Sequence, residues 1–162
     1  MYQYPGCEIC KVVSNLRPEF VIIDGKYWNA NLGYQNQTLL GASFITLKRH
    51  AYELDELTAN EEAELVVIRN KLLKSLRKTF GPLNFNVSCL KNDAFRADPD
   101  NTLREASHVH WHIRPRYRNR PVEFAGKVFK DPMPGRYLRT YDYYEPSRET
   151  ATKIAKAIRQ NL

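Results

Sequence analysis

Three of the four histidines lie in one short stretch, at His108, His110 and His112. Apolar residues stand between and after them, so polar and apolar positions alternate with the period of two that is typical of a β-strand. A helix is excluded, because 3.6 residues per turn would distribute the three imidazoles around its axis. On a strand the three rings would leave from one face, while the other face is buried through Val109, Trp111 and Ile113.

The spacing of the three imidazoles limits the chemistry that they can do. Same-face neighbours on a strand are roughly 6.5–7 Å apart, so the outer pair is about 13 Å apart. A zinc–nitrogen bond measures only about 2.0–2.1 Å. One metal ion therefore cannot hold all three rings, and we expect the histidines to have separate roles. The alternative is a surface strand whose histidines have no function.

The histidine stretch also resembles a known signature. The sequence HVHWHI at 108–113 is similar to the His-x-His-x-His signature, with apolar x, of the histidine triad (HIT) superfamily of nucleotidyl hydrolases and transferases. The following residues 114–117 (RPRY) resemble the Pro-Arg continuation of many bacterial members. Residues 7–10 (CEIC) and 41–50 (GASFITLKRH) resemble further motifs of the family in the expected order. The resemblance therefore covers residues 7 to 117.

The resemblance implies a fold and an activity. The implied fold is α+β, with an antiparallel sheet of about five strands and helices packed on it. The implied protein is a nucleotide-binding hydrolase or nucleotidyltransferase that acts at an α-phosphate. His110 would be the nucleophile and form a covalent nucleotidyl-histidine intermediate, and His112 would bond the phosphate oxygens or the leaving group. Dinucleoside polyphosphates or nucleoside phosphoramidates are the implied substrates, Mg²⁺ could accompany them, and a homodimer is the implied assembly.

Cys7 and Cys10 form a Cys-x-x-Cys pair that we expect in a short N-terminal loop. In a reducing compartment such a pair indicates a metal or redox site, and the βαβ context of a thioredoxin-like motif is missing here. A structural zinc needs two further ligands, and His50 is the one histidine outside the triad. Zinc-bearing relatives of the family have a comparable arrangement, which implies a Cys₂His₂ zinc site of Cys7, Cys10, His50 and His108. The alternative is a pair of buried thiols without a metal.

Four strands besides the histidine strand are predicted from β-branched and alternating runs. The first two, at 20–23 and 27–32, are joined by a turn at 24–26. The third covers Ser43 to Leu47, and the fourth covers Leu83 to Leu90. The resemblance places the second strand near a base and ribose, so Trp28 is a candidate for stacking on a nucleobase, with core packing as the alternative.

Two helices are predicted from their caps and apolar stripes. Residues 58–61 (TANE) form a capping box. The helix that follows ends at Gly81-Pro82, and its apolar stripe consists of Leu65, Ile68, Leu72 and Leu76. We expect this helix to pack on the sheet and assign it no chemistry. Pro146-Ser147 begins the last helix, whose apolar face consists of Ala151, Ile154, Ala155 and Ile158.

The connection from residue 91 to residue 107 is polar and charged. In the family the corresponding segment contacts phosphate and often carries a Gly-Gln or an Asn. This sequence has REAS at 104–107 in place of the Gly-Gln. Asn92 and Ser107 are therefore our candidates for phosphate contacts. The tail at 118–162 is rich in aromatic residues, which we expect to wrap the domain or to complete a pocket.

Length and composition favour one domain over residues 1–162, with an ordinary apolar content and no long polar tract. No apolar run approaches the length of a membrane span. The N-terminus lacks the features of a secretory signal, and three cysteines are an odd number for a disulfide framework. We therefore expect a cytoplasmic protein without membrane partners.

The formal net charge of +7 would attract anionic substrates such as nucleotides. Nucleic acid is not the expected partner, because no recognition-helix, OB or RRM signature is present. Besides the enzyme, two classes stay open: a non-catalytic, zinc-stabilised nucleotide-binding or interaction protein, and a nucleic-acid processing factor. A binding protein would be stabilised by nucleotide without turnover, and a processing factor would bind with steep salt dependence.

Overall fold

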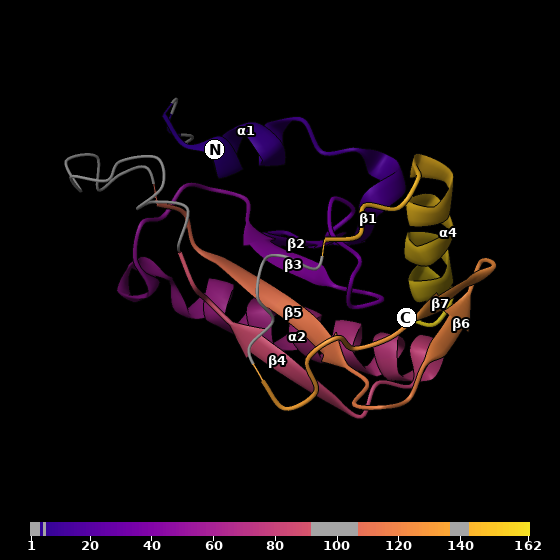
Figure 1. The fold of residues 1–162 in the computed structure, drawn as a ribbon. Helices are drawn as coiled ribbons and strands as arrows, with labels where there is room; N and C mark the ends of the chain where they lie inside the picture. Colours follow the sequence, from indigo (N-terminus) through magenta and orange to yellow (C-terminus); the bar gives the residue numbers. More distant parts are fainter. Residues whose placement is uncertain (1–3, 5, 92–106, 137–142) are drawn as a thin grey trace.

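The computed structural model describes residue 4 and residues 6–91, 107–136 and 143–162 (Figure 1). Its centre is an antiparallel sheet of five strands: β1 (Val21–Asp24), β2 (Trp28–Leu32), β3 (Ser43–Leu47), β4 (Asn84–Ser88) and β5 (His110–Arg116). The described helices are α1 (Glu8–Ser14), α2 (Ala59–Phe80) and α4 (Arg148–Arg159), with short 3-10 turns η1 (Pro18–Phe20) and η2 (Leu54–Glu56). The predicted α+β class and the sheet of about five strands are confirmed.

The strand order is β1-β2-β3-β5-β4. The first three strands are neighbours in sequence and in space. The chain then crosses one face of the sheet as α2, forms the edge strand β4 and returns as β5 between β3 and β4 (Figure 1). The histidine strand therefore lies inside the sheet, with hydrogen-bonded neighbours on both sides that fix its register.

The register divides the sheet into an apolar and a polar face. Trp28 is paired with Leu47 and Ala30 with Ile45, and all four of these side chains are fully buried. The alternate positions of the same strands point the other way, because successive side chains of a strand leave from opposite faces. His110 of β5 is paired with one of these alternate positions, Thr46. The polar face of the sheet thus carries the histidines.

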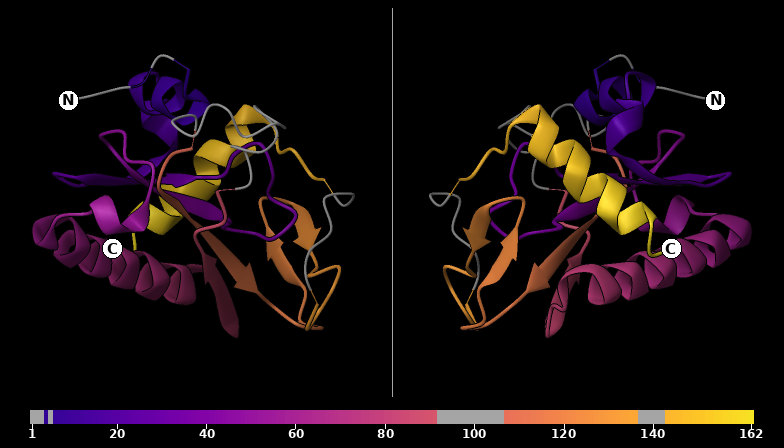
Figure 2. Two further views of the ribbon diagram at one scale, coloured as in Figure 1. Left: turned by 90° about the vertical axis from the view of Figure 1, so that its left-hand side faces the viewer. Right: turned by 90° about the vertical axis from the view of Figure 1, so that its right-hand side faces the viewer.

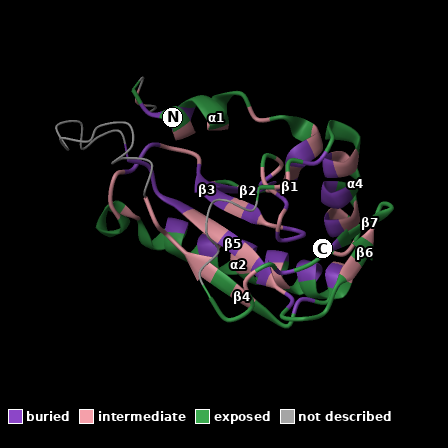
Figure 3. Cartoon of the chain, in the orientation of Figure 1, coloured by how far each residue is buried: buried purple, intermediate pink, exposed green. Residues whose placement is uncertain are grey.

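Helix α2 covers the apolar face. Its N-terminus has the predicted capping box, in which the Thr58 side chain accepts from Glu61 N–H and the Glu61 side chain accepts from Thr58 N–H. Its C-terminus is capped by Gly81 at φ +64°, a left-handed conformation that glycine adopts without strain. Figure 3 shows buried segments along α2. The predicted apolar stripe is confirmed as buried in one core with the apolar face of the sheet: Leu65, Ile68, Leu72 and Leu76.

Helix α4 packs beside α2 and against β1 and β2. Its predicted apolar face is buried as expected: Ala151, Ile154, Ala155 and Ile158. Ser75 of α2 donates a hydrogen bond to the carbonyl of Ile158, at 2.6 Å. Arg159 donates to the carbonyls of Glu19 and Val21, which joins the end of α4 to the start of β1. None of the described helices has an apolar stretch long enough to cross a bilayer.

Helix α1 lies on the opposite side of the sheet from α2 (Figure 2). The aromatic tail adds a small hairpin of β6 (Val122–Phe124) and β7 (Lys127–Phe129), which the sequence analysis did not predict. Phe124 packs edge-on against Phe80 of α2, with ring centroids 5.2 Å apart. Phe129 is buried and contacts Tyr144 in the same manner. The described tail therefore wraps the domain, one of the two expected roles.

Candidate functional site

Strand β5 positions two of the three histidines on the polar face. In the pairing of β3 with β5, His110 lies opposite Thr46 and His112 lies opposite Phe44. Their rings are 4.9 Å apart between centroids, closer than the spacing of the strand itself. The predicted strand began at His108, but β5 begins at His110. His108 lies just before the strand, and its ring belongs to a different cluster.

His108 faces the two cysteines. Its Nδ1 is 3.5 Å from Sγ of Cys7 and 3.4 Å from Sγ of Cys10. His50 approaches from the end of β3, with its Nδ1 3.4 Å from Sγ of Cys10. The ligand atoms of all four residues lie within 4.8 Å of one another, and all four residues are buried. The structure therefore brings together the four predicted metal ligands.

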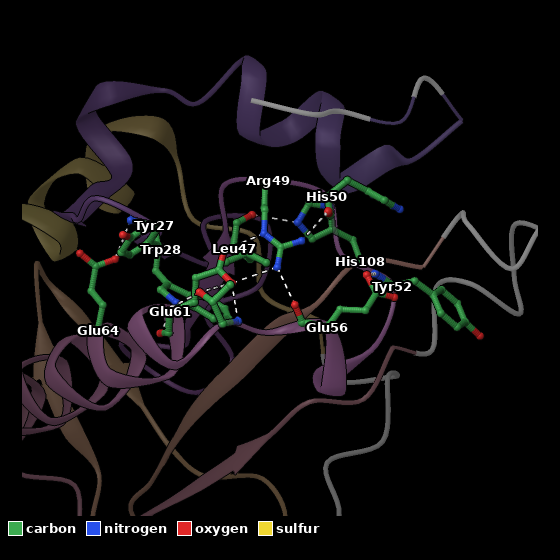
Figure 4. Close-up of polar contacts among 11 residues, drawn as sticks. Tyr27, Trp28, Leu47, Arg49, His50, Tyr52, Glu56, Glu61, Glu64 and His108 are labelled. Atoms are coloured by element: carbon green, nitrogen blue, oxygen red, sulfur yellow. Dashed lines mark hydrogen bonds and ion pairs between the residues drawn. The ribbon is translucent and has the colours of Figure 1, made fainter.

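These distances fit a tetrahedral metal ion. Bonds of about 2.3 Å to sulfur and about 2.0–2.1 Å to nitrogen hold the sulfur and nitrogen ligands of a tetrahedral zinc about 3.5 Å apart. The observed sulfur–nitrogen distances are 3.4 and 3.5 Å. Nε2 of His108 donates to the carbonyl of Leu47, at 2.8 Å (Figure 4). This bond leaves the lone pair of His108 on Nδ1, directed at the thiols, as a metal ligand requires.

Burial shapes the protonation of the cluster. It raises the pKa of Cys7 to about 11 and lowers the pKa of His108 to about 4. Both shifts have the same cause, because burial disfavours the charged form of each group. His108 is thereby kept neutral, which is the ligand form. A bound cation would supply the positive charge that a buried thiolate lacks.

Helix α1 presents the cysteines, and here the structure corrects a prediction. Cys7 and Cys10 were expected in a loop, but Cys7 is the N-cap of α1 and Cys10 lies in its first turn. Sγ of Cys7 accepts a hydrogen bond from Cys10 N–H, at 3.4 Å. The i, i+3 spacing on a helix directs both sulfurs to one side. The short helix is thus an element that positions the cluster.

The His50 end of the cluster is braced by an ion pair. Arg49 contacts Glu61 of α2 through two bonds, from Nε to Oε1 at 2.6 Å and from Nη2 to Oε2 at 2.9 Å (Figure 4). The same guanidinium donates to the carbonyls of His50 and Glu56. Arg49 therefore has a structural role at this end of the cluster.

His110 is oriented by its own backbone. Its Nδ1 lies 2.7 Å from the carbonyl oxygen of His108. A carbonyl can only accept, so Nδ1 carries a proton, and in the neutral ring the lone pair is then on Nε2. His110 is buried and His112 is half-buried. The ring of Phe44 packs edge-on against His112, with centroids 4.9 Å apart. One imidazole is thus fixed as a potential nucleophile beside a second, more accessible one.

Both histidines line a pocket of about 710 Å³ between α1 and the polar face of the sheet. This volume lies in the range of small-molecule and cofactor sites. Polar groups from the sheet form one part of its lining: Asn31, Thr46, His110, His112 and Arg114. Apolar and aromatic side chains form much of the remainder: Ile9, Val12, Leu16, Phe20, Leu32, Tyr34, Phe44 and Tyr143. Such a pocket can take a molecule with a charged part and a flat, apolar part.

The candidate substrate-binding residues have different outcomes. Trp28 is fully buried and donates from Nε1 to the carbonyl of Glu61, at 2.8 Å. It points to the apolar face and does not line the pocket, so core packing, the alternative, is what the structure shows. Ser107 is buried, and its Oγ has no hydrogen-bond partner in the described structure. Asn92 lies outside the described residues.

Two pocket residues were missed by the sequence analysis. Asn31 of β2 lies on the polar face, and its Oδ1 is buried without a partner in the described chain. The alternation of Asn29, Ala30 and Asn31 could have indicated this position, because it places both amide side chains on the face of the strand that points away from the core. Arg114 continues the row of His110 and His112 by two residues, but we considered it only as part of a family motif.

Comparisons with known proteins matched the chain to solved structures only. The sequence matches no protein-family model, and no curated protein matches it. Solved structures do match. A Hit-like protein involved in cell-cycle regulation from Bartonella henselae has 18% identity and a TM-score of 0.65, over 100% of this chain and 99% of that one. A hypothetical histidine triad nucleotide-binding protein from Sulfolobus tokodaii has 16% identity and a TM-score of 0.63, over 96% and 91%.

A zinc-bound histidine triad family protein from Mycobacterium smegmatis is also similar, with 18% identity and a TM-score of 0.57 over 95% and 94% of the two chains. At these identities the likeness concerns the fold. This chain therefore has the fold of the histidine triad proteins, and the fold that its motifs implied is confirmed. The Cys7, Cys10, His50 and His108 cluster fits the zinc-bearing branch of that fold.

Proposed function

We propose that this protein is a nucleotidyl hydrolase or nucleotidyltransferase that cleaves a phosphoanhydride or phosphoramidate at an α-phosphate. The observation that carries the proposal is the state of His110. Its Nδ1 proton is bound by the carbonyl of His108, which leaves a lone pair on Nε2 in a pocket that also contains His112. A neutral, oriented imidazole is a competent nucleophile near pH 7.

In the first step, Nε2 of His110 attacks the α-phosphorus. A phosphorus–nitrogen bond forms and the bond from phosphorus to the leaving group breaks, which gives a covalent nucleotidyl-histidine. The imidazole gains positive charge during the attack. The carbonyl of His108 stabilises that charge through the Nδ1 hydrogen bond at 2.7 Å, since the hydrogen bond becomes charge-assisted.

His112 is proposed to act on the leaving group. Its ring is 4.9 Å from that of His110 between centroids, so both rings can contact one phosphate group from different sides. Negative charge develops on the leaving atom as its bond breaks, and a proton donor at that atom lowers the barrier. In the second step, water or another acceptor attacks the phosphorus and releases His110.

The pocket supports a nucleotide as the substrate. Its apolar part can contact a base through Leu16 and Tyr34. Asn31 presents a buried carbonyl oxygen that lacks a partner in the described structure, and a ribose hydroxyl could donate to it. A phosphate next to the ribose would then lie toward the histidines of β5.

The Cys7, Cys10, His50 and His108 cluster is proposed to hold a structural zinc. Four protein ligands would leave no open position for water or substrate, so the ion would fix the start of β5 against α1 rather than react. Through His108, whose carbonyl orients His110, the cluster would hold the nucleophile in place. An Mg²⁺ ion carried by the substrate and a homodimeric assembly stay predictions from the family resemblance.

Trapping of the intermediate tests the proposal. Dinucleoside polyphosphates and nucleoside phosphoramidates labelled at the α-phosphate would be incubated with the protein and quenched in base, which preserves a phosphorus–nitrogen bond to histidine. We expect turnover of at least one class and label on the peptide that contains His110. Nucleotide-dependent stabilisation without turnover or label would instead identify a non-catalytic binding protein.

A further inference from the structure

Arg114 lies on the same face of β5 as His110 and His112, and it has no role in the proposed chemistry. Side chains two residues apart on a strand leave from the same face, so His110, His112 and Arg114 follow one another along the polar face. Arg114 is paired with Asn86 of β4. It lines the same pocket as the two histidines. One pocket thus contains a nucleophile, a second imidazole and a guanidinium in linear order.

A comparison with Arg116 shows what is unusual about Arg114. Arg116 is bound by Asp131 through two contacts, at 2.7 and 3.1 Å, and also donates to Asn86 at 2.8 Å. The side chain of Arg114 has no hydrogen bond or ion pair with any residue that the structure describes, although it is half-buried. Burial and the like charge of Arg116 both lower the pKa of Arg114. Its charge is therefore poorly compensated within the described chain.

A partly buried cation without a partner is unfavourable unless an anion binds to it and neutralises its charge. A guanidinium carries five donors in a planar fork that matches the oxygens of a phosphate. The position of Arg114 specifies where such an anion would lie. It is one strand repeat beyond His112, which is the residue proposed to act on the leaving group.

We propose that Arg114 binds a second anionic group of the substrate, on the leaving-group side of the scissile bond. This inference rests on the proposed function and makes its substrate class specific. The preferred substrates are phosphoanhydrides, in which the leaving group is itself a phosphate or polyphosphate. Phosphoramidates and esters with an uncharged leaving group would not engage Arg114. Arg114 is thus a specificity-determining residue rather than part of the bond-breaking machinery.

The test compares Arg114→Gln with the parent on two substrates that share adenosine 5′-phosphate. The 4-nitrophenyl ester of AMP has an uncharged leaving portion, and diadenosine tetraphosphate has a polyanionic one. We expect kcat/KM for the tetraphosphate to fall by about tenfold or more, as for the loss of a charge-assisted bond. The value for the ester should change less than about twofold. Arg114→Lys, which keeps the charge but loses the fork, should lose less.

The matched control is Arg120→Gln, which removes the same charge from an exposed position after β5. It should leave the preference for the tetraphosphate unchanged and so exclude a general effect of net charge. A thermal melt of each variant would show that the chains are folded. Equal losses on both substrates, or no loss on either, would overturn the role of Arg114.

A binding measurement separates this inference from the proposed function. Calorimetric titration with AMP and with ADP requires no turnover. We expect Arg114→Gln to weaken ADP binding by about tenfold while AMP binding is kept, because only ADP has the second phosphate. This result would support Arg114 as an anion site even in a protein that cleaves neither substrate. Unchanged ADP binding would overturn the inference even if catalysis is confirmed.

Discussion

The cysteine–histidine cluster and the pocket on the polar face contain the same residue type from one short stretch, yet their surroundings differ. His108 is enclosed by Cys7, Cys10 and His50, and burial lowers its pKa to about 4. Its second nitrogen is bound to a backbone carbonyl. His110 and His112 instead border a pocket of about 710 Å³. The contrast teaches that the role of an imidazole depends on what faces its lone pair.

His108 joins the two regions directly. The ring of His108 belongs to the cluster, while its backbone carbonyl accepts the Nδ1 proton of His110. Strand β5 begins only at His110, so the cluster fixes the segment immediately before the strand. Changes in the pocket should therefore abolish chemistry without loss of stability. Changes in the cluster should first reduce stability.

The largest expected effect is on the pocket side. His110→Ala should reduce turnover by at least about 10⁴-fold, because the covalent route loses its nucleophile. Nucleotide binding and the melting temperature should stay near those of the parent, since the Cys7, Cys10, His50 and His108 cluster is intact. Steady-state kinetics, calorimetry and a thermal melt measure these three quantities. Activity near that of the parent would refute a covalent mechanism through His110.

A double substitution, Cys7→Ser with Cys10→Ser, addresses the other side of the comparison. We expect loss of the one zinc per chain that the cluster geometry fits, and a fall in melting temperature of roughly 10 °C, as for a loss of about 3 kcal/mol in a chain of this size. Elemental analysis and calorimetry measure the two effects. Chelation of the parent protein should lower its melting temperature before it changes turnover.

Cys89→Ser is the matched control for the double substitution. Cys89 is half-buried and lies outside the four-residue cluster. Its substitution should keep the zinc content of the parent. Zinc content that is equal in the double variant and in the parent would disprove the proposed ligand set, and protein purified without chelator that contains no zinc would disprove the site itself.

The third prediction separates the two histidines within the pocket. His112→Ala should slow a substrate with a poor leaving group by about 10²-fold or more, because a proton donor matters most when the leaving group is basic. A substrate with the same nucleotide and an acidic leaving group should be slowed far less. His110→Ala, in contrast, should affect both alike. Equal losses in His112→Ala would mean that His112 only positions the phosphate.

Two of the helices and the residues of the cluster could be predicted from the sequence. The capping box at Thr58 and the apolar stripes of α2 and α4 gave helices that the structure confirms, because both signals are local. The four cluster residues were predicted from the Cys-x-x-Cys spacing, from the one histidine outside the triad, and from the family resemblance, which implied His108 as the fourth ligand. Such local patterns are sufficient for elements whose structure depends on residues that are close in sequence.

The remaining features depend on partners that are distant in sequence. Helix α1 was missed because its seven residues, EICKVVS, have no clear apolar stripe. The face of Trp28 could not be assigned until the pairing of β2 with β3 was known. The ion pair of Arg49 with Glu61, twelve residues further along the chain, was not predicted from the sequence. Pairings of this kind become visible only when the fold places the two residues together.

The smallest expected effect concerns this ion pair, which braces the His50 side of the cluster. The guanidinium of Arg49 holds the pKa of Glu61 at about 2, well below the usual 4.5. A carboxylate whose pKa is lowered by folding contributes stability above its unfolded pKa and loses it as the pH falls through its folded pKa. Glu61→Gln should therefore cost about 2 kcal/mol in the free energy of unfolding at pH 7, because solvent at the partly exposed Arg49 screens part of the interaction. The difference between variant and parent should begin to shrink below about pH 4.5 and become small near pH 2.

Denaturant titrations over this pH range measure the difference. The control is Glu62→Gln, at an exposed position in the first turn of the same helix, which should cost less than about 1 kcal/mol. A difference between Glu61→Gln and the parent that does not change with pH would mean that packing, rather than the charge pair with Arg49, accounts for the loss.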